Sequence, residues 1–177
     1  MPAPSILLLV AHPGLHYSRV NRALMDAATT LTAQSHAPQI TVRDLYACYP
    51  DQMLDVQTEQ TLAEQADLIV WQHPIHWFSM PPLMKQWLDE VLTQGWAYGE
   101  GGTALQGKDL WLVASTGGYE GADTFLPPYE QTAAVCGMRF LPPLILHGLN
   151  ALSDADLQTH ITVYQHRLAS YPNWPEN

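Results

Sequence analysis

Polar residues suited to bind an anion follow residues 5–10, an apolar run near the start of the chain. His12 comes two residues after that run, and Ser18 stands where the capping residue of a helix is expected. Amides of a helix's first turn lie at the positive end of the helix dipole, and with hydroxyl and imidazole donors they suit a phosphate monoester. We therefore expect a phosphate site formed by His12, Ser18, Arg19, Val20 and Asn21. An ordinary turn with a capped helix explains the same residues.

A second candidate segment, rich in aromatic residues and proline, follows the apolar run 67–72. Its central residues are Pro74, Ile75, His76, Trp77 and Phe78. Proline restricts the chain, and aromatic side chains can pack against the edge of a planar ring while backbone amides reach its heteroatoms. The segment predicts a cradle for a planar ligand, although a hydrophobic loop buried in the core or in a subunit interface has the same composition. His73 and His76 lack a third ligand in register, so we expect no metal.

A third candidate segment, Ser115-Thr116-Gly117-Gly118, follows the apolar run 109–115. Glycine lets backbone amides approach a ligand closely, so donors are again expected to converge. A flexible turn is the alternative for this segment alone. Three ligand-compatible loops, each after an apolar run, together favour a binding site.

Strands and helices that alternate along the chain must position these loops. Apolar runs that predict strands cover residues 5–10, 39–45, 67–72, 109–115 and 140–147, and helical spacing marks residues 20–31, 56–66, 83–91, part of 129–136 and 153–169. Near-continuous apolar strands with intervening helices predict a parallel sheet in the order 2-1-3-4-5, with helices on both faces. Ligands bind at the C-terminal strand ends of such sheets, near the first and third strands.

Composition narrows the class of protein. The chain has 177 residues, 47% of them apolar, which predicts one domain over residues 1–177, with residues 171–177 as a frayed tail. A net charge of −10 and the lack of a basic run argue against nucleic acid. There is no apolar stretch of roughly 18 residues, no basic N-terminal flank and no G-x-G-x-x-G or P-loop motif. With only Cys48 and Cys136, we expect a cytoplasmic protein.

Short motifs spread over nearly the whole chain carry a family resemblance. They are Ala11-His12-Pro13, Asp44-Leu45-Tyr46, Tyr49-Pro50-Asp51, Gln72-His73-Pro74, Lys85-Gln86-Trp87-Leu88-Asp89, Gly95-Trp96-Ala97-Tyr98-Gly99 and Leu141-Pro142-Pro143. Together with the three loops, they resemble the flavodoxin-like NAD(P)H:quinone oxidoreductase family, the group that contains DT-diaphorase. Within that family they are most similar to the bacterial ancillary proteins of the glutathione-gated potassium efflux system.

This resemblance implies a flavodoxin-like three-layer sandwich that binds FMN, with FAD as the alternative, and NAD(P)H as co-substrate. Hydride would pass from NAD(P)H through flavin to quinones or similar electrophiles. His12 and residues 18–21 would hold the phosphate and ribityl end of the flavin. Residues 74–77, beside Phe78, would line the isoalloxazine, and residues 115–118 would meet its pyrimidine side. The protein need supply no acid for hydride transfer.

The resemblance also implies a homodimer with two shared sites. In the glycine-rich segment 95–102, Trp96 and Tyr98 are costly to leave in water, so we expect them to pack outside their own βα unit, with Tyr98 forming a substrate wall in the partner's site. Packing within one subunit is the alternative. The family carries a tyrosine and a histidine in a longer segment after Thr-Gly-Gly; here Tyr119 is the partial substitute.

Three other functions remain open at this stage. The first is an FMN-binding regulatory subunit that docks on a membrane potassium antiporter, peripherally at the inner membrane. The second is a one-electron carrier flavodoxin. The loop after residues 5–10 disfavours this function, because flavodoxins carry a Ser/Thr-rich phosphate loop where this chain has Ala-His-Pro. The third is an interaction domain without flavin.

Overall fold

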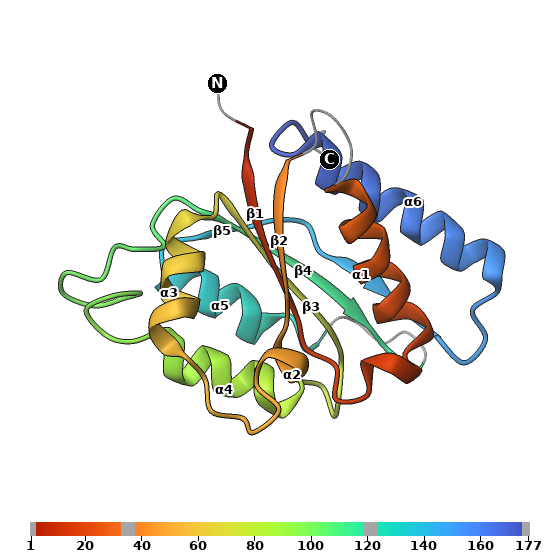
Figure 1. Ribbon diagram of the computed structural model, residues 1–177, viewed down its shortest axis with the longest axis horizontal. Coiled ribbons are helices and arrows are strands. Elements are labelled where there is room, and N and C mark those ends of the chain that lie inside the picture. The colour runs from red at the N-terminus through yellow and green to blue at the C-terminus, as the bar shows by residue number, and fades with distance from the viewer. Residues whose placement is uncertain (1–2, 33–37, 119–123, 175–177) are drawn as a thin grey trace.

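A parallel sheet forms the centre of the molecule (Figure 1). The computed structural model describes residues 3–32, 38–118 and 124–174. Strand order is β2-β1-β3-β4-β5, and β6 also pairs with β4, so the predicted order is confirmed. The strands are β1 (Ser5–Val10), β2 (Gln39–Asp44), β3 (Leu68–Pro74), β4 (Asp109–Ser115), β5 (Arg139–Phe140) and β6 (Leu144–Leu146).

The last predicted strand, residues 140–147, is divided in two. β5 pairs with the start of β4 and β6 with its end, both in parallel. Pro142 and Pro143 stand between them, and proline has no amide hydrogen to give to a strand ladder. A single strand was therefore the wrong prediction here, although the pairing partner was right.

Helices cover both faces of the sheet, which makes the predicted three-layer sandwich (Figure 1). On one face lie α1 (Arg19–Leu31) and α6 (Asp154–Ser170), and on the other α3 (Val56–Gln65), α4 (Pro82–Val91) and α5 (Pro127–Val135). Two short elements, η1 (Leu15–Tyr17) and α2 (Leu45–Cys48), lie in the loops after β1 and β2. Within the described ranges, no helix is long and apolar enough to cross a membrane.

Alternation along the buried strands divides the core between the two faces. Ile6, Leu8 and Val10 of β1 pack with α1 and α6, whereas Leu7 and Leu9 pack with the opposite layer. β1, β3 and β4 are buried almost throughout because helices cover both of their faces. The sheet is therefore a rigid support for the loops at its C-terminal edge.

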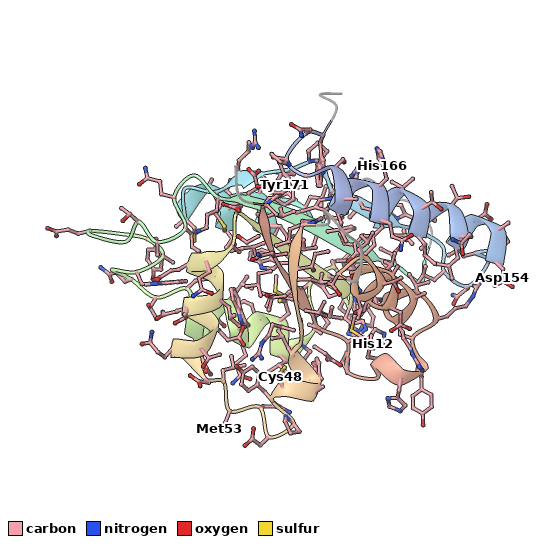
Figure 2. The ribbon with its side chains drawn as sticks, turned by 45° about the horizontal axis from the view of Figure 1, so that its top comes forward. His12, Cys48, Met53, Asp154, His166 and Tyr171 are labelled. Carbon is pink, nitrogen blue, oxygen red and sulfur yellow. The ribbon has the colours of Figure 1, made fainter. Side chains whose placement is uncertain are left out.

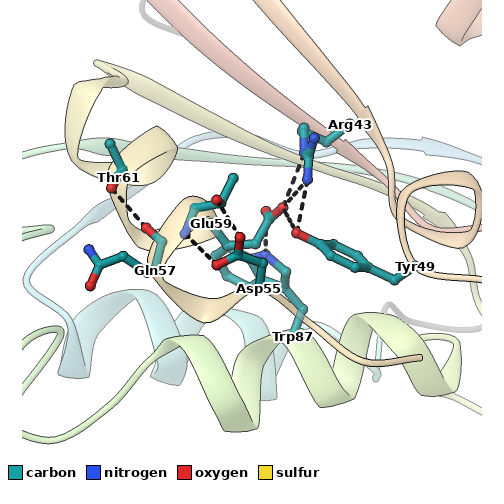
Figure 3. A network of polar contacts seen from close by, with 8 residues as sticks. Arg43, Tyr49, Asp55, Gln57, Glu59, Thr61 and Trp87 are labelled. Carbon is teal, nitrogen blue, oxygen red and sulfur yellow. Dashed lines mark hydrogen bonds and ion pairs between the residues drawn. The ribbon is translucent and has the colours of Figure 1, made fainter. Parts of the chain in front are cut away.

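A buried carboxylate joins three elements of the layer that contains α3 and α4 (Figure 3). Glu59 on α3 is inaccessible to solvent; its Oε1 accepts from Arg43 Nη2 at 2.6 Å and from the Tyr49 hydroxyl at 2.7 Å. Trp87 Nε1 of α4 donates to Oε2 at 2.9 Å. Burial and the hydrogen bond to Glu59 raise the pKa of Tyr49 to about 12. This network fixes β2, α3 and α4 relative to one another, and both oxygens of the buried charge have partners.

The chain end packs on the sheet instead of fraying, as far as residue 174. Tyr171 is buried, and its hydroxyl donates to Asp109 Oδ2 at 2.9 Å. Trp174 lies edge-on to Trp111 with ring centroids 4.9 Å apart, and its Nε1 donates to Arg167 O at 2.6 Å. The predicted frayed tail is wrong for residues 171–174, because burial of two aromatic rings outweighs the entropy of a chain end.

Candidate functional site

Three loops meet at the C-terminal edge of the sheet because β1, β3 and β4 are neighbours. Val10 pairs with Gln72, and Pro74 pairs with Ser115. Beyond the strands, Ile75 N donates to Ser115 O at 2.8 Å, and Asn21 Nδ2 at the start of α1 donates to Ser115 Oγ at 3.0 Å. The structure thus brings together the ends of the three loops predicted from the sequence.

Ser18 caps α1 as predicted. Its hydroxyl accepts from Asn21 N at 3.1 Å, so the Asn21 amide, expected among the phosphate donors, is not free. The amides of Arg19 and Val20 remain at the helix end, where no carbonyl of the helix can accept from them. Two backbone donors of the predicted three are left for an anion.

Side chains of these residues turn away from the loop. The Arg19 guanidinium donates to Leu152 O at 2.7 Å and to Asp154 Oδ1 at 2.5 Å, which ties α1 to α6. Val20 packs in the core, and Asn21 is buried against Ser115. Of residues 19–21, only the backbone amides of Arg19 and Val20 are therefore left as candidate donors to an anion.

His12 is placed as a hydrogen-bond donor. Its Nδ1 accepts from Gly14 N at 3.0 Å, so the ring hydrogen of the neutral imidazole lies on Nε2. Burial lowers the pKa of His12, nearby His76 lowers it further, and Asp44 opposes both effects. His12 also borders a pocket of about 440 Å³ on the β2 side of the loop, with Arg22 and Asp44 among its lining residues. It follows the C-terminal end of β1, at the edge of the sheet opposite Tyr171 (Figure 2).

The aromatic segment after β3 is a tight hairpin turn. His76 N donates to Ser79 O at 2.8 Å, and Ser79 N donates to His76 O at 3.0 Å. Trp77 and Phe78 between them have φ values of 48° and 62°. Positive φ at both central residues is usual for Asn and Gly, and costs a bulky residue about 1–2 kcal/mol. The turn therefore holds two large residues in a strained backbone.

The two strained residues also face solvent. Trp77 is 93% exposed and Phe78 is 70% exposed. Large apolar side chains held outward by a strained turn are stabilised by nothing within the described chain. Such a combination of strain and exposure is found at ligand sites.

A buried histidine lies directly before this turn. His73 is inaccessible to solvent, its ring stacks on Tyr129 with centroids 5.6 Å apart, and burial lowers its pKa to about 4. Its Nδ1 lies 2.9 Å from Pro74 O and donates to it, because a carbonyl can only accept. His73 Nε2 and the Tyr129 hydroxyl have no hydrogen-bond partner among the described residues. The neutral ring thereby fixes the peptide that begins the turn.

Gln72 and Tyr164 are further residues that sequence reasoning did not assign. Gln72 Nε2 donates to Asn21 O at 2.8 Å, and the Tyr164 hydroxyl donates to Gln72 Oε1 at 2.9 Å. A polar Gln-His pair at the end of an apolar strand was the available signal. Together with Asn21 and Ser115, these residues lock α1 and α6 to the ends of β3 and β4.

The Thr-Gly-Gly loop leaves room for a ligand. A Cβ built on Gly117 or on Gly118 would meet no heavy atom of the described residues within 4 Å. The Thr116 hydroxyl donates to Gly118 O at 3.1 Å and lies 3.2 Å from His147 Nδ1. Tyr119, predicted as a weak catalytic substitute, lies outside the described residues.

Trp96 and Tyr98 of the segment 95–102 have different surroundings. Trp96 packs against the core of its own subunit, and its Nε1 donates to Glu64 Oε1 at 2.5 Å. Trp96 therefore packs outside its own βα unit, as expected, but it does so on α3 of the same subunit, which is the alternative stated for this segment. Tyr98 is 37% exposed and lines a pocket of about 370 Å³ with residues of α4 and α5. A Cβ on Gly102 would stand 2.2 Å from Tyr98 O, so only glycine allows this close return of the chain.

A family model described as the flavodoxin-like fold matches residues 4–168. The chain belongs to this flavodoxin-like family. A curated relative, the glutathione-regulated potassium-efflux system ancillary protein KefF of Salmonella schwarzengrund, is 42% identical over 175 residues, which cover 94% of this chain and 96% of the relative. The resemblance inferred from the motifs is confirmed.

Solved structures similar to this flavodoxin-like protein carry several descriptions. General stress protein 14 of Treponema denticola, in complex with FMN, has a TM-score of 0.82 at 39% identity, covering 93% of this chain and 98% of that chain. An NADPH-quinone reductase from P. pentosaceus has a TM-score of 0.80 at 29% identity, covering 97% and 99%. A Streptomycin violaceusniger enzyme described as a thermophilic tryptophan halogenase has a TM-score of 0.84 at 40% identity, covering 95% and 99%.

Proposed function

We propose that this protein binds FMN and transfers hydride from NAD(P)H through the flavin to quinones or similar electrophiles. One observation carries the proposal: donor-bearing loops after β1, β3 and β4 meet at one sheet edge beside two exposed, strained aromatic residues. The FMN complex of the Treponema denticola relative and the name of the P. pentosaceus relative support it. FAD is the alternative cofactor.

The residues present fit FMN. At the phosphate end, the Arg19 and Val20 amides, the Ser18 hydroxyl and His12 Nε2–H are the proposed donors. At the ring, Gly117 and Gly118 leave space for close approach of the backbone, and Trp77 with Phe78 provides apolar surface. Bound FMN would supply the hydride chemistry.

The chain's own residues then have three tasks. His12 stays neutral because burial lowers its pKa, so it donates one hydrogen bond without adding a full charge. Trp77 and Phe78 would cover the bound ring and exclude water from it. Backbone amides at Gly117 and Gly118 would stabilise negative charge at the pyrimidine edge of a bound flavin, with no side-chain acid required.

We also propose a homodimer in which Tyr98 forms part of the partner's substrate pocket. Its exposure and the conformation that Gly102 imposes on the segment support this role. The cellular site under this proposal is the cytoplasm. Activity lost in an FMN-loaded Tyr98→Ala dimer, with FMN affinity retained, is the expected result.

A second function rests on the 42% identity to the potassium-efflux ancillary protein. In this alternative the protein binds FMN but acts by docking on a membrane potassium antiporter, peripherally at the inner membrane. FMN binding is common to both functions. Turnover with a free quinone separates them.

The test uses purified protein loaded with FMN. Under the proposed function, NADPH or NADH bleaches the flavin absorbance anaerobically, and a quinone restores it over repeated turnovers. A protein that binds FMN and is not bleached would favour the regulatory function. A protein that binds no flavin would contradict both.

A further inference from the structure

The Thr-Gly-Gly loop is held along one side by residues 146–150, the last residue of β6 and the four residues that follow it. Thr116 N donates to Leu146 O at 2.9 Å. The next three carbonyls then all accept from that segment: Thr116 O from Leu149 N, Gly117 O from Asn150 Nδ2, and Gly118 O from Gly148 N, each at 3.1 Å. A continuous clamp therefore fixes the direction of the successive carbonyls.

This clamp also fixes the direction of the amides. In a trans peptide the N–H points opposite to the C=O, so the amides of Gly117 and Gly118 point away from residues 148–150. β4 lies between β6 and β3, so the side opposite the clamp is the side of β3 and of the Trp77–Phe78 turn. Neither amide has an acceptor among the described residues.

We propose that the segment 146–150 aims the Gly117 and Gly118 amides at the pyrimidine edge of the flavin, with Asn150 as the positioning residue. The inference rests on the proposed function. The peptide between Gly117 and Gly118 has glycine on both sides and rotates easily, because neither residue has a Cβ to restrict it. The carbonyl of this peptide, Gly117 O, accepts from the side chain of Asn150. The neighbouring carbonyls of Thr116 and Gly118 accept from backbone amides.

A free Gly117–Gly118 peptide affects the two redox states of the flavin unequally. Reduced flavin carries negative charge at the pyrimidine edge, and an aimed amide stabilises it more than the neutral oxidised ring. Loss of the Asn150 clamp therefore weakens binding of reduced FMN selectively. The reduction potential falls accordingly.

The experiment compares Asn150→Ala and Asn150→Asp with the wild type. Dissociation constants are measured for oxidised FMN by fluorescence, and the two-electron potential by equilibration with a reference dye. For Asn150→Ala we expect the dissociation constant of oxidised FMN to change less than twofold and that of reduced FMN to rise about fivefold. That fivefold change equals about 20 mV of lower potential, since tenfold corresponds to about 30 mV. Asn150→Asp, which places an acceptor against Gly117 O, has the larger effect.

Asn173→Ala and Asn173→Asp are the matched controls. Asn173 is exposed in the tail that packs at the opposite edge of the sheet, so these changes should leave the potential unaltered. An Asn150→Ala protein with wild-type potential would overturn the inference while FMN binding still stood. Equal weakening of oxidised and reduced FMN would also overturn it, because a merely structural role predicts that result. A wild type that binds no FMN would instead refute the proposed function.

Discussion

The Glu59 network and the Trp77–Phe78 turn each contain side chains in an unfavourable environment, but only those of the Glu59 network have partners that compensate for it. The Glu59 carboxylate is inaccessible to solvent, yet both of its oxygens accept hydrogen bonds, from Arg43 of β2, from Tyr49 in the loop between α2 and α3, and from Trp87 of α4. Trp77 and Phe78 are apolar, yet they are exposed and strained. The groups of the first region have their partners within the described chain, whereas the turn presents apolar surface to solvent. This difference is the reason for assigning Glu59 a structural role and for proposing a ligand-binding role for Trp77 and Phe78.

Substitution of Glu59 should give the largest effect on stability. Glu59→Ala leaves Arg43, Tyr49 and Trp87 without their shared acceptor, and we expect a loss of about 3–5 kcal/mol in the free energy of unfolding. Denaturant titration measures it. Exposed Glu90→Gln is the control and should change stability by less than about 0.5 kcal/mol. A Glu59→Ala protein as stable as the control would contradict the structural assignment.

The buried His73 should make stability depend on pH. Its folded pKa of about 4 lies below the ordinary value of 6.5, so the unfolded chain binds more protons between these values. Stability is full above pH 6.5 and falls by up to about 3 kcal/mol as pH drops toward 4. His73→Phe should remove this part of the pH dependence, whereas exposed His166→Phe should retain it. Parallel pH curves for wild type and His73→Phe would disprove the claim.

Ser18 has both a structural and a proposed functional role, because it caps α1 and belongs to the proposed phosphate site. Ser18→Ala should lower stability by about 1 kcal/mol through the lost cap, and should weaken FMN binding by a similar amount. Thermal unfolding without flavin and FMN titration separate the two effects. Ser153→Ala, which removes the cap of α6, is the matched control and should affect stability alone.

Substitution in the Trp77–Phe78 turn should increase stability instead of lowering it. Phe78→Gly relieves the positive φ, so we expect the protein without flavin to gain about 0.5–1 kcal/mol. FMN affinity and turnover should fall because, in the proposed site, Phe78 covers the ring. Phe125→Gly, at a buried position, is a contrasting control that should only destabilise. A Phe78→Gly protein that is both less stable and fully active would reverse the comparison.

Much of the fold follows from local pattern, and the exceptions have physical causes. Apolar runs predicted the sheet order because both faces of β1, β3 and β4 are buried, and the Ser18 cap is a local signal. The packed tail depends on contacts of Tyr171 and Trp174 with distant strands, which no local pattern encodes.

The candidate site was only partly predictable for the same reason. Sequence placed its three loops correctly, since their position depends on strand order. Side-chain direction was not predictable: Arg19 turns to Asp154, Asn21 turns to Ser115, and Trp96 packs within its own subunit. The clamp by residues 146–150 also depends on the division of the last strand, which brings them beside Thr116.

Fluorescence of bound FMN tests the central claim most directly, that the exposed turn after β3 covers a flavin. FMN is titrated into the wild type and into Trp77→Ala, and emission of the bound flavin is compared at saturation. We predict strong quenching in the wild type, because the proposed site places Trp77 against the ring, and a clear recovery of emission in Trp77→Ala with FMN still bound. Bright emission of bound FMN in the wild type, equal to that of Trp77→Ala, would contradict the account.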